Sequence, residues 1–416
     1  MTAAPPSTDP DEAPHHREAP VPHVRGTRDW LPEDFAPLAG LERRLLDHFN
    51  GAGFQAIRTP ILEVTELHQR KSGAGIVSKL YELADGRPHR LCLRPELTAG
   101  VVRAFTDAPE PPPLPWRVCL SGPVFRYERD PKPGRYREFT QVGVELLGAP
   151  GPSADAEVIA LADQAAIGAG LAGTTIRIGH VGLILELFER SGLPTAAVST
   201  LIEGLSEAAA EGHSVRALES ALDQLSGWLR GPAEQEAEQV LPAIERADDS
   251  GVDRLFRHLV PDVTGRRNGH EIIHRLRRKW DLGHTLVGTL ERFRDQIHAL
   301  ADLRGPADEV LDRLGRDFEN LAPQSIEELR ELSRELDRRG VERSRVLLDL
   351  GFGHGIGFYS QMIFDLSVST SDGPVGVCHG GRYDGLARVL GSDRDPHGVG
   401  FAFGLERLYH CVEARR

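Results

Sequence analysis

Two stretches of the sequence decide the expected fold: FRYERDPKPGRYREF at residues 125–139 and GVGFAFGLERL at residues 398–408. The first lies between two runs that read as long strands, about 116–128 and 137–147, and its centre is a polar loop containing Pro and Gly. Strands joined by such a loop pair in antiparallel fashion, and the sequence has no βαβ series with a Gly-rich phosphate loop. The pattern therefore favours an antiparallel sheet flanked by helices over a doubly wound fold.

Helical signals surround these strands and make the expected fold class α+β. Leu38, Leu41, Leu45 and Phe49 recur every three or four residues, which predicts one apolar helix face. Between about residues 186 and 343 the pattern is almost purely helical, and strand signals return at residue 344. We therefore expect a disordered tail at residues 1–23, a discontinuous core formed by residues 24–185 and 344–416, and a helical insertion at residues 186–343.

The bulk composition argues against some function classes. The 416 residues carry a formal net charge of −13, whereas a free-standing nucleic-acid binder usually has the opposite sign. Cys92, Cys119, Cys378 and Cys411 are far apart and form no CxxC pair, so neither a zinc knuckle nor a disulfide framework is indicated. Residues 158–173, the most apolar long stretch, are too short and too polar to span a bilayer. A cytoplasmic protein is the simplest expectation.

Charged and aromatic side chains gather on the two long strands. Alternate residues of a strand share a face, so Arg126 and Glu128 lie together, as do Arg137, Phe139 and Gln141 on the next strand. Arginines offer a planar fork to phosphate oxygens, and an aromatic ring can stack on a purine. A nucleotide site is one interpretation of this pattern. A surface ladder of Arg–Glu ion pairs is the other, since exposed charge pairs are common.

Further motifs narrow the interpretation to one family. Residues 125–139 and 398–408 resemble the second and third signature motifs of class II aminoacyl-tRNA synthetases, and Pro60, which ends a strand after a long helix, resembles the first, which forms the dimer interface in that family. The opening RGTRDWLP (25–32) and GGRYDGL (380–386) resemble the histidyl enzyme, as does RPELTAGVVRAF (94–105). The resemblance covers about residues 24–185 and 344–410 and implies a class II catalytic core.

The resemblance also implies roles for individual residues. Arg126 would hold the α-phosphate of ATP, Phe139 would stack on adenine, and Arg407 would lie on the other side of the nucleotide. Glu128 and Arg137 complete the implied ATP-binding set. The residues implied to hold the ammonium and carboxylate region of the amino acid are Glu96, Thr98, Gln141 and Glu145, and those implied to contact its imidazole are Tyr359 and Tyr383.

The sequence departs from the family at a position that matters for catalysis. Where histidyl enzymes carry RGLDYYTG, this chain has HGIGFYSQ at residues 354–361, so His354 replaces the catalytic Arg, Gly357 replaces Asp and Phe358 replaces the first Tyr. His is not equivalent to a permanently charged, bidentate Arg, and losing such a group can cost roughly a hundred-fold in rate. In addition, nine residues follow Arg407 where the family's anticodon-binding domain would be expected.

These features give two function hypotheses. The first is a histidine-binding regulatory subunit of ATP phosphoribosyltransferase, a synthetase-like protein of histidine biosynthesis that is not itself catalytic and does not charge tRNA. Its expected partners are histidine, a short-form catalytic subunit and a second copy of the chain, without tRNA or a membrane. The alternative is a synthetase paralogue, an adenylating ligase that activates histidine or a similar amino acid with ATP and Mg²⁺. The intact ATP motifs, including Arg126 and Arg407, favour the alternative.

One short motif suggests a different chemistry. His270, Glu271 and His274 match HExxH, which on a helix could bind zinc with the Glu as base. A third ligand, His284 or Glu291, would be needed, and the flanking sequence is strongly basic. A polar helix face is the favoured interpretation, because short motifs match by chance, and we expect no metal site.

Overall fold

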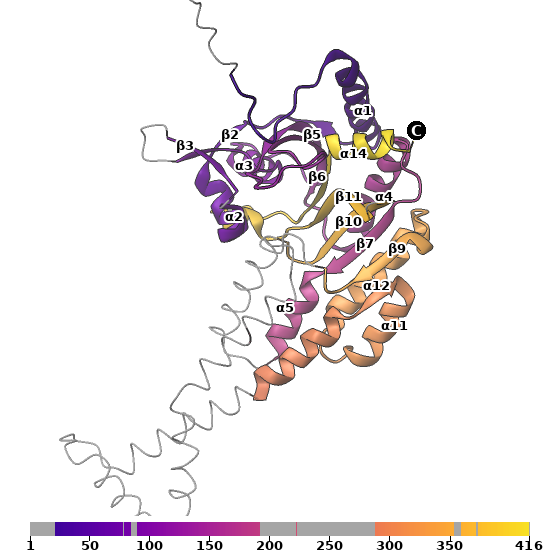
Figure 1. The fold of residues 1–416 in the computed structure, drawn as a ribbon. Helices are drawn as coiled ribbons and strands as arrows, with labels where there is room; N and C mark the ends of the chain where they lie inside the picture. The colour runs from indigo at the N-terminus through magenta and orange to yellow at the C-terminus, as the bar shows by residue number, and fades with distance from the viewer. Residues whose placement is uncertain are drawn as a thin grey trace, which may run out of the picture.

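The computed structural model describes residues 21–77, 79–84, 90–191, 222, 288–352, 359–371 and 373–415. A nine-stranded sheet forms the centre of the molecule (Figure 1). Its strands, in spatial order, are β1 (Gln55–Ala56), β5 (Trp116–Phe125), β6 (Glu138–Leu147), β12 (Gly398–Gly404), β11 (Gly373–Arg382), β10 (Met362–Thr370), β7 (Thr175–His180), β9 (Val346–Asp349) and β8 (Arg304–Pro306). All neighbours are antiparallel except the pairs β1–β5 and β7–β9. The expected large sheet flanked by helices is confirmed.

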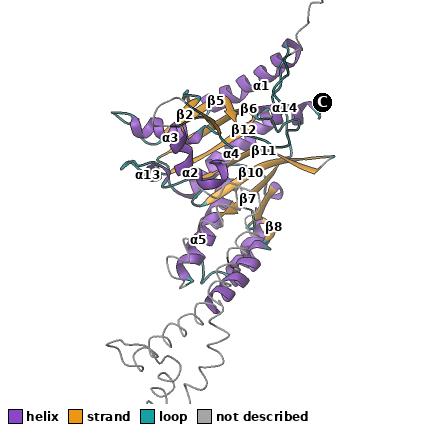
Figure 2. Cartoon of the chain, turned by 60° about the vertical axis from the view of Figure 1, so that its left-hand side comes forward, coloured by secondary structure: helices purple, strands orange, loops and turns teal. Residues whose placement is uncertain are grey.

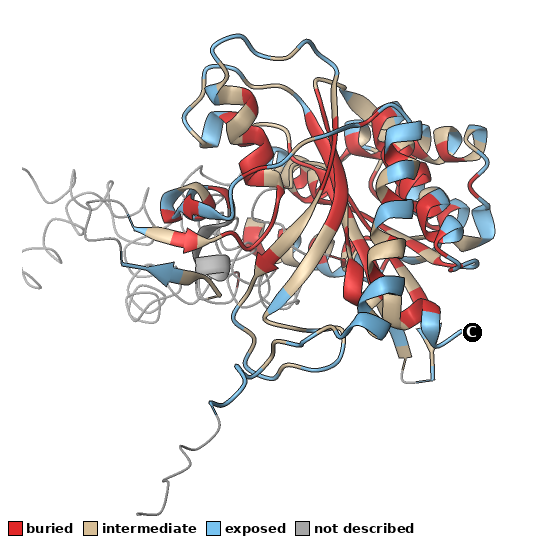
Figure 3. Cartoon of the chain, turned by 90° about the horizontal axis from the view of Figure 1, so that it is seen from above, coloured by how far each residue is buried: buried red, intermediate tan, exposed pale blue. Residues whose placement is uncertain are grey.

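Three helices cover one face of this sheet: α1 (Pro32–Gly51), α4 (Gly151–Gly168) and α14 (Leu405–Glu413). The apolar face predicted for α1 is confirmed, because Leu38, Leu41, Leu45 and Phe49 are all buried. They belong to the largest apolar cluster, which also takes in alternate residues of the strands beneath, such as Val142, Val144 and Leu146 of β6. The core thus lies between the sheet and these helices, where Figure 3 shows the buried residues concentrated.

The other face of the sheet carries smaller elements. Helix α3 (Thr98–Asp107) packs with α2 (Thr65–Val77) and α13 (Leu386–Val389), and these lie beside a three-stranded sheet of order β2 (Leu62–Val64), β4 (Leu91–Leu93) and β3 (Tyr81–Leu83), as Figure 2 shows. A small apolar cluster joins Val102 and Phe105 of α3 to Leu147 of β6 and Tyr383 after β11. Fewer apolar side chains therefore pack on this face than on the face covered by α1, α4 and α14, and polar groups can lie there.

The range predicted as a helical insertion also contributes to the sheet. Strand β8 (Arg304–Pro306) pairs with β9, and α11 (Ala307–Asp317) and α12 (Pro323–Arg338) pack beside it. Helix α5 (Val181–Arg190) begins directly after β7. The domain boundaries at residues 185 and 344 remain predictions. The four cysteines are buried and free. No described helix has the length and apolarity to cross a membrane.

Candidate amino-acid and nucleotide site

The candidate site lies on the sheet face turned away from α1 and α4. Successive side chains of a strand point to opposite faces, and Val142, Val144 and Leu146 of β6 point into the helix-covered core. Phe139, Gln141 and Glu145 therefore point to the opposite face. Three of the residues predicted from the family motifs are thus placed in one row by the register of a single strand.

Glu145 is the central carboxylate of this row. Its Oε1 accepts a hydrogen bond from the Thr98 hydroxyl at 2.6 Å, and its Oε2 accepts one from the Tyr383 hydroxyl. Burial raises the pKa of Glu145 to about 7, although both hydrogen bonds oppose the shift. Two neutral donors therefore fix the position of the carboxylate. A cationic ligand would stabilise its ionised form. The predicted residues Thr98, Glu145 and Tyr383 are brought together by elements far apart in the chain.

Glycines on β12 make room for these side chains. Gly400 is the register partner of Glu145, and a Cβ at this glycine would lie only 1.9 Å from Glu145 Oε2. A Cβ at Gly398 would lie 2.2 Å from the Tyr383 ring. The intervening Val399, together with Phe401 and Phe403, packs into the core on the other face. The alternation of small and large residues in GVGFAFG therefore separates the site face from the core face.

Glu96 is the second buried carboxylate, and protein groups already surround it. Lys71 Nζ donates to Oε2 at 2.6 Å, and the Thr98 backbone N–H donates to the same oxygen at 2.7 Å. The Ala99 backbone N–H donates to Oε1 at 3.2 Å, and His68 Nδ1 lies 3.3 Å from that oxygen. Burial would raise the pKa of Glu96, but the charge of Lys71 and the contact with His68 outweigh it and hold the pKa well below the ordinary value.

Lys71 and His68 are functional candidates that the sequence motifs did not indicate. Both lie on α2, three residues apart and so on one helix face, and both are buried. Their spacing in the sequence indicates only that they share one face of a helix. It does not indicate their contact with Glu96, which lies 25 residues beyond Lys71.

Two further residues complete the amino-acid side of the site. The Gln141 Oε1 atom is buried and accepts no hydrogen bond within the part of the chain described here. The Tyr359 ring lies against β11, where a Cβ at Gly381 would be 2.8 Å from it. Burial raises the pKa of Tyr359, and the charges of Glu145 and Glu96 raise it further. Tyr359 is therefore within electrostatic reach of both carboxylates. Its contact with an imidazole, which the family resemblance implies, stays a prediction.

The nucleotide side of the site is built on two partly buried arginines, Arg126 and Arg407. Arg126 Cζ lies 5.5 Å from the centre of the Phe139 ring, and Arg126 Nε donates to the Pro95 carbonyl at 2.8 Å. Arg407 donates from Nε to the Gly134 carbonyl and from Nη1 to the Gly376 carbonyl, both at 3.0 Å. Burial lowers the pKa of both arginines. Among the described residues neither forms an ion pair with a carboxylate, which suits an incoming polyphosphate.

The remaining residues of the predicted ATP set lie at the strand ends and in the loop. Arg137 donates from Nε to the Glu128 carbonyl, and its Cζ lies 4.6 Å above Tyr127 rather than beside Phe139. The Glu128 carboxylate accepts a hydrogen bond from Arg135 Nε at 2.6 Å. The Arg126 backbone N–H donates to the Arg137 carbonyl, so the pairing of the two strands continues to Arg137, although its guanidinium turns to the Tyr127 ring. Glu128, which pairs with Arg135, matches the ion-pair interpretation, whereas Arg126 and Phe139 do not.

Some predicted positions cannot be placed. His354, Gly357 and Phe358 lie outside the described residues, as do the HExxH residues His270, Glu271 and His274. Within the described part of the chain, no cluster of His, Cys, Asp and Glu could hold a metal ion. The zinc hypothesis is therefore untested.

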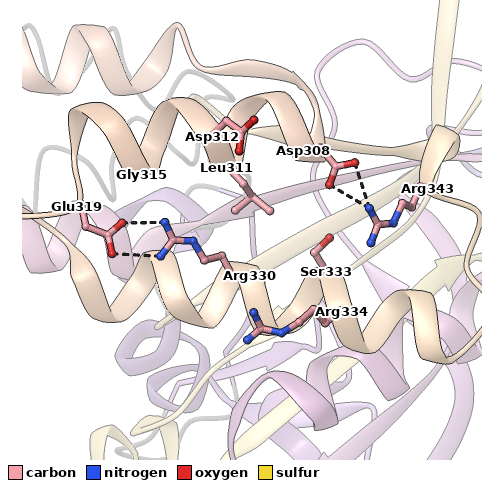
Figure 4. A pocket seen from close by; sticks show the side chains of 9 residues that line it. All are labelled: Asp308, Leu311, Asp312, Gly315, Glu319, Arg330, Ser333, Arg334 and Arg343. Atoms are coloured by element: carbon pink, nitrogen blue, oxygen red, sulfur yellow. Dashed lines mark hydrogen bonds and ion pairs between the residues drawn. The ribbon is translucent and has the colours of Figure 1, made fainter.

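A separate hollow of about 450 Å³ lies between α11 and α12, toward the opposite edge of the sheet. Figure 4 shows two Arg–carboxylate pairs among the side chains that line it, whereas Asp312 and Arg334 are drawn without a partner in this set. Arg330 binds Glu319 through both terminal nitrogens, and Arg343 binds Asp308. Four of its charged side chains are therefore compensated within the hollow, and Arg334 pairs with Glu327.

Comparison with known proteins agrees with the geometry. A model of the histidyl-tRNA synthetase family matches residues 26–249 and 248–408. The histidine–tRNA ligase of Thermococcus kodakarensis is 31% identical over 391 residues, covering 94% of this chain and 74% of that protein. The ligase of Pyrococcus horikoshii is 29% identical over 394 residues, covering 94% and 75%.

Solved structures share the fold at lower identity. A structure from Bacillus halodurans C, described as an ATP phosphoribosyltransferase regulatory subunit/histidyl-tRNA synthetase, has a TM-score of 0.63 at 23% identity and covers 96% of this chain and 84% of that chain. Apo histidyl-tRNA synthetase from S. aureus has a TM-score of 0.56 at 23% identity, covering 95% and 74%. On the family match and the relative in Thermococcus, this chain belongs to the histidyl-tRNA synthetase family.

Proposed function

We propose that this chain binds histidine on the site face and acts as a regulatory subunit of ATP phosphoribosyltransferase. The observation that carries the proposal is a pair of polar groups on one face of β6: Glu145, a buried carboxylate fixed by two hydroxyl groups, and Gln141, whose buried Oε1 atom accepts no hydrogen bond from the described residues. A buried acceptor of this kind calls for a donor from a ligand. Histidine brings a cationic amino group and two ring nitrogens.

The placement of the predicted residues supports an amino acid of this size and polarity. Thr98, Gln141 and Glu145 offer acceptors to an ammonium group, and Tyr359 and Tyr383 lie close by to face a ring. An imidazole needs a defined partner at each nitrogen, which hydroxyl groups can supply as donors or as acceptors.

His354 supports regulation over catalysis. It occupies the position of the family's catalytic Arg, and a His that is neutral for part of the time cannot replace that fork at a developing negative charge. The Bacillus halodurans structure carries both descriptions, regulatory subunit and synthetase, so the shared fold does not choose between them. A homodimer in the cytoplasm, with a short-form catalytic subunit as partner, completes the proposal.

Two measurements test the proposal. Histidine should raise the thermal unfolding temperature of the chain, whereas arginine and leucine should not. When a short-form ATP phosphoribosyltransferase catalytic subunit is co-expressed, it should co-elute with the chain in gel filtration, and histidine should lower the activity of the complex. Histidine protection without any complex would remove the regulatory part, and the absence of protection would remove the binding part.

Amino-acid activation is a second candidate, favoured by the two partly buried arginines Arg126 and Arg407. Both offer donors to an anion, and Phe139 offers a ring to a purine, so the residues fit ATP. In this reaction a carboxylate oxygen of the amino acid forms a bond to the α-phosphorus, and pyrophosphate leaves. Histidine-dependent exchange of pyrophosphate into ATP would establish this activity. Restoring the family residue with His354→Arg is the matched variant, and exchange that appears only in that variant would favour the regulatory proposal.

A further inference from the structure

Lys71 is an unusual feature of the histidine pocket proposed above. Its side chain is completely buried, and its ammonium group donates to Glu96 Oε2 at 2.6 Å. The charge of Lys71 also acts on Glu145, since it is one of the influences that oppose the rise in the pKa of that carboxylate. Lys71 therefore acts electrostatically on both buried acids of the pocket.

Glu96 has little capacity left for a ligand. Oε2 accepts hydrogen bonds from Lys71 and from the Thr98 backbone N–H, and Oε1 accepts one from the Ala99 backbone N–H and faces His68 Nδ1. A carboxylate offers about four lone-pair directions, and the three hydrogen bonds occupy most of them. A ligand ammonium can approach Glu96 only by competing with Lys71 for the same charge.

The charge balance of the pocket then depends strongly on Lys71. With Lys71 present, one of the two carboxylates is hydrogen-bonded to a buried cation, so a ligand needs to compensate only part of the negative charge. Arg126 also acts on Glu96 through its charge but forms no ion pair with it among the described residues. Without Lys71, the two buried carboxylates would lose their ion-paired cation from α2. A buried charge that loses its partner is strongly unfavourable, so the pocket would prefer a cationic ligand over a neutral one by a larger factor.

We propose that Lys71 is a specificity-determining residue, the built-in counter-charge that sets how strictly the pocket selects a ligand with an α-ammonium group. Its presence relaxes the requirement for that group. The inference rests on histidine binding at this site but not on the regulatory role.

The test compares two ligands that differ at one position. L-histidine carries an α-ammonium group, and L-β-imidazolelactic acid carries a hydroxyl there. Dissociation constants for both are measured by isothermal titration calorimetry at about pH 8, where the free imidazole is neutral. The reported quantity is the ratio of the two constants. Lys71→Met and Lys71→Gln remove the charge, and the Gln variant keeps a hydrogen-bond donor. Lys71→Arg keeps the charge.

The dissociation constant of imidazolelactic acid divided by that of histidine should be at least about tenfold larger in the Met and Gln variants than in the wild-type chain. In the Arg variant this ratio should stay close to the wild-type value. Arg70→Met is the matched control. Arg70 is the neighbouring cation on α2, but its side chain is half exposed and pairs with Glu66, so its loss should leave the ratio unchanged.

Three results would overturn the inference. Parallel weakening of both ligands would mean that Lys71 only supports the structure. A ratio that moves toward imidazolelactic acid would contradict the charge argument. Failure of both uncharged variants to fold would assign Lys71 to folding rather than to selection. If wild-type chain binds neither ligand, it is the proposed histidine binding that fails, which separates the two cases.

Discussion

The amino-acid and nucleotide sides of the site are prepared for their ligands in opposite ways. On the amino-acid side, buried carboxylates are already engaged by side-chain and backbone donors, as Glu96 is by Lys71 and Glu145 is by Thr98 and Tyr383. On the nucleotide side, Arg126 and Arg407 donate to backbone carbonyls. Carbonyl groups position a guanidinium without neutralising it.

This difference teaches how each side gains binding energy. A buried, pre-oriented carboxylate loses little freedom on binding and gains chiefly from a correctly placed cation. A partly buried arginine that donates to carbonyl groups keeps its full charge for an anion, which can form charge-assisted hydrogen bonds with it. The first arrangement favours selection among similar ligands, and the second favours strong attraction of phosphate. Four predictions test this contrast.

The largest expected effect comes from Glu145→Gln. The amide keeps the size of the side chain but removes the charge, so histidine should bind at least about thirtyfold more weakly. Calorimetric titration with histidine measures the loss. Glu157→Gln is the control, because Glu157 pairs with Arg117 away from the site face and should leave the affinity unchanged. A change of less than about threefold in Glu145→Gln would show that Glu145 is not the ligand's partner.

Arg126→Met should separate the two sides. We expect ATP affinity to fall by about tenfold or more, because a partly buried charge-assisted contact is removed, while histidine affinity changes little. Titration with each ligand in turn measures both. Equal losses for the two ligands would mean that the sides are not independent. Undetectable ATP binding by the wild-type chain would remove the contrast altogether.

Protonation of Glu145 should influence stability with a definite sign. Its pKa in the folded chain is raised from 4.5 to about 7, so between these pH values it is protonated in the folded state and ionised in the unfolded state. Proton loss on unfolding means that its contribution to the free energy of unfolding falls as pH rises through this window, by about 1–3 kcal/mol in total.

Urea denaturation of Glu145→Gln and the wild-type chain at several pH values measures this contribution. The variant should gain stability relative to wild type as pH rises from about 5 to 7.5. Glu96, whose pKa is lowered, has the opposite sign: its contribution is present above about pH 4.5 and is lost as pH falls through its folded-state pKa. A flat difference between the two chains across the window would contradict a buried, protonated Glu145.

The smallest effect is expected from Arg135→Ala. Arg135 pairs with Glu128, but its side chain is largely exposed, and exposed ion pairs contribute little. ATP affinity should change by less than about threefold, and unfolding by less than about 1 kcal/mol. Loss of ATP binding comparable to that of Arg126→Met would extend the nucleotide site into the loop and weaken the distinction between partly buried and exposed arginines.

The sequence by itself determined the family, the large sheet flanked by helices and one face of the site. Period-two alternation in GVGFAFG places Gly398 and Gly400 on the side opposite Phe401, and a helical period places Leu38 and Phe49 in the core. These are local properties, because the geometry of a strand or a helix fixes which neighbours share a face.

Only the tertiary structure decided which residues meet across those faces. Tyr383 reaches Glu145 across 238 residues of sequence, Lys71 neutralises Glu96, and Arg137 lies over Tyr127 instead of beside Phe139. Strand β8, within a range that reads as helical, joins the sheet because β9 offers it a free edge. Periodicity identifies a face but not its partner, since the partner depends on strand register and on how distant elements pack.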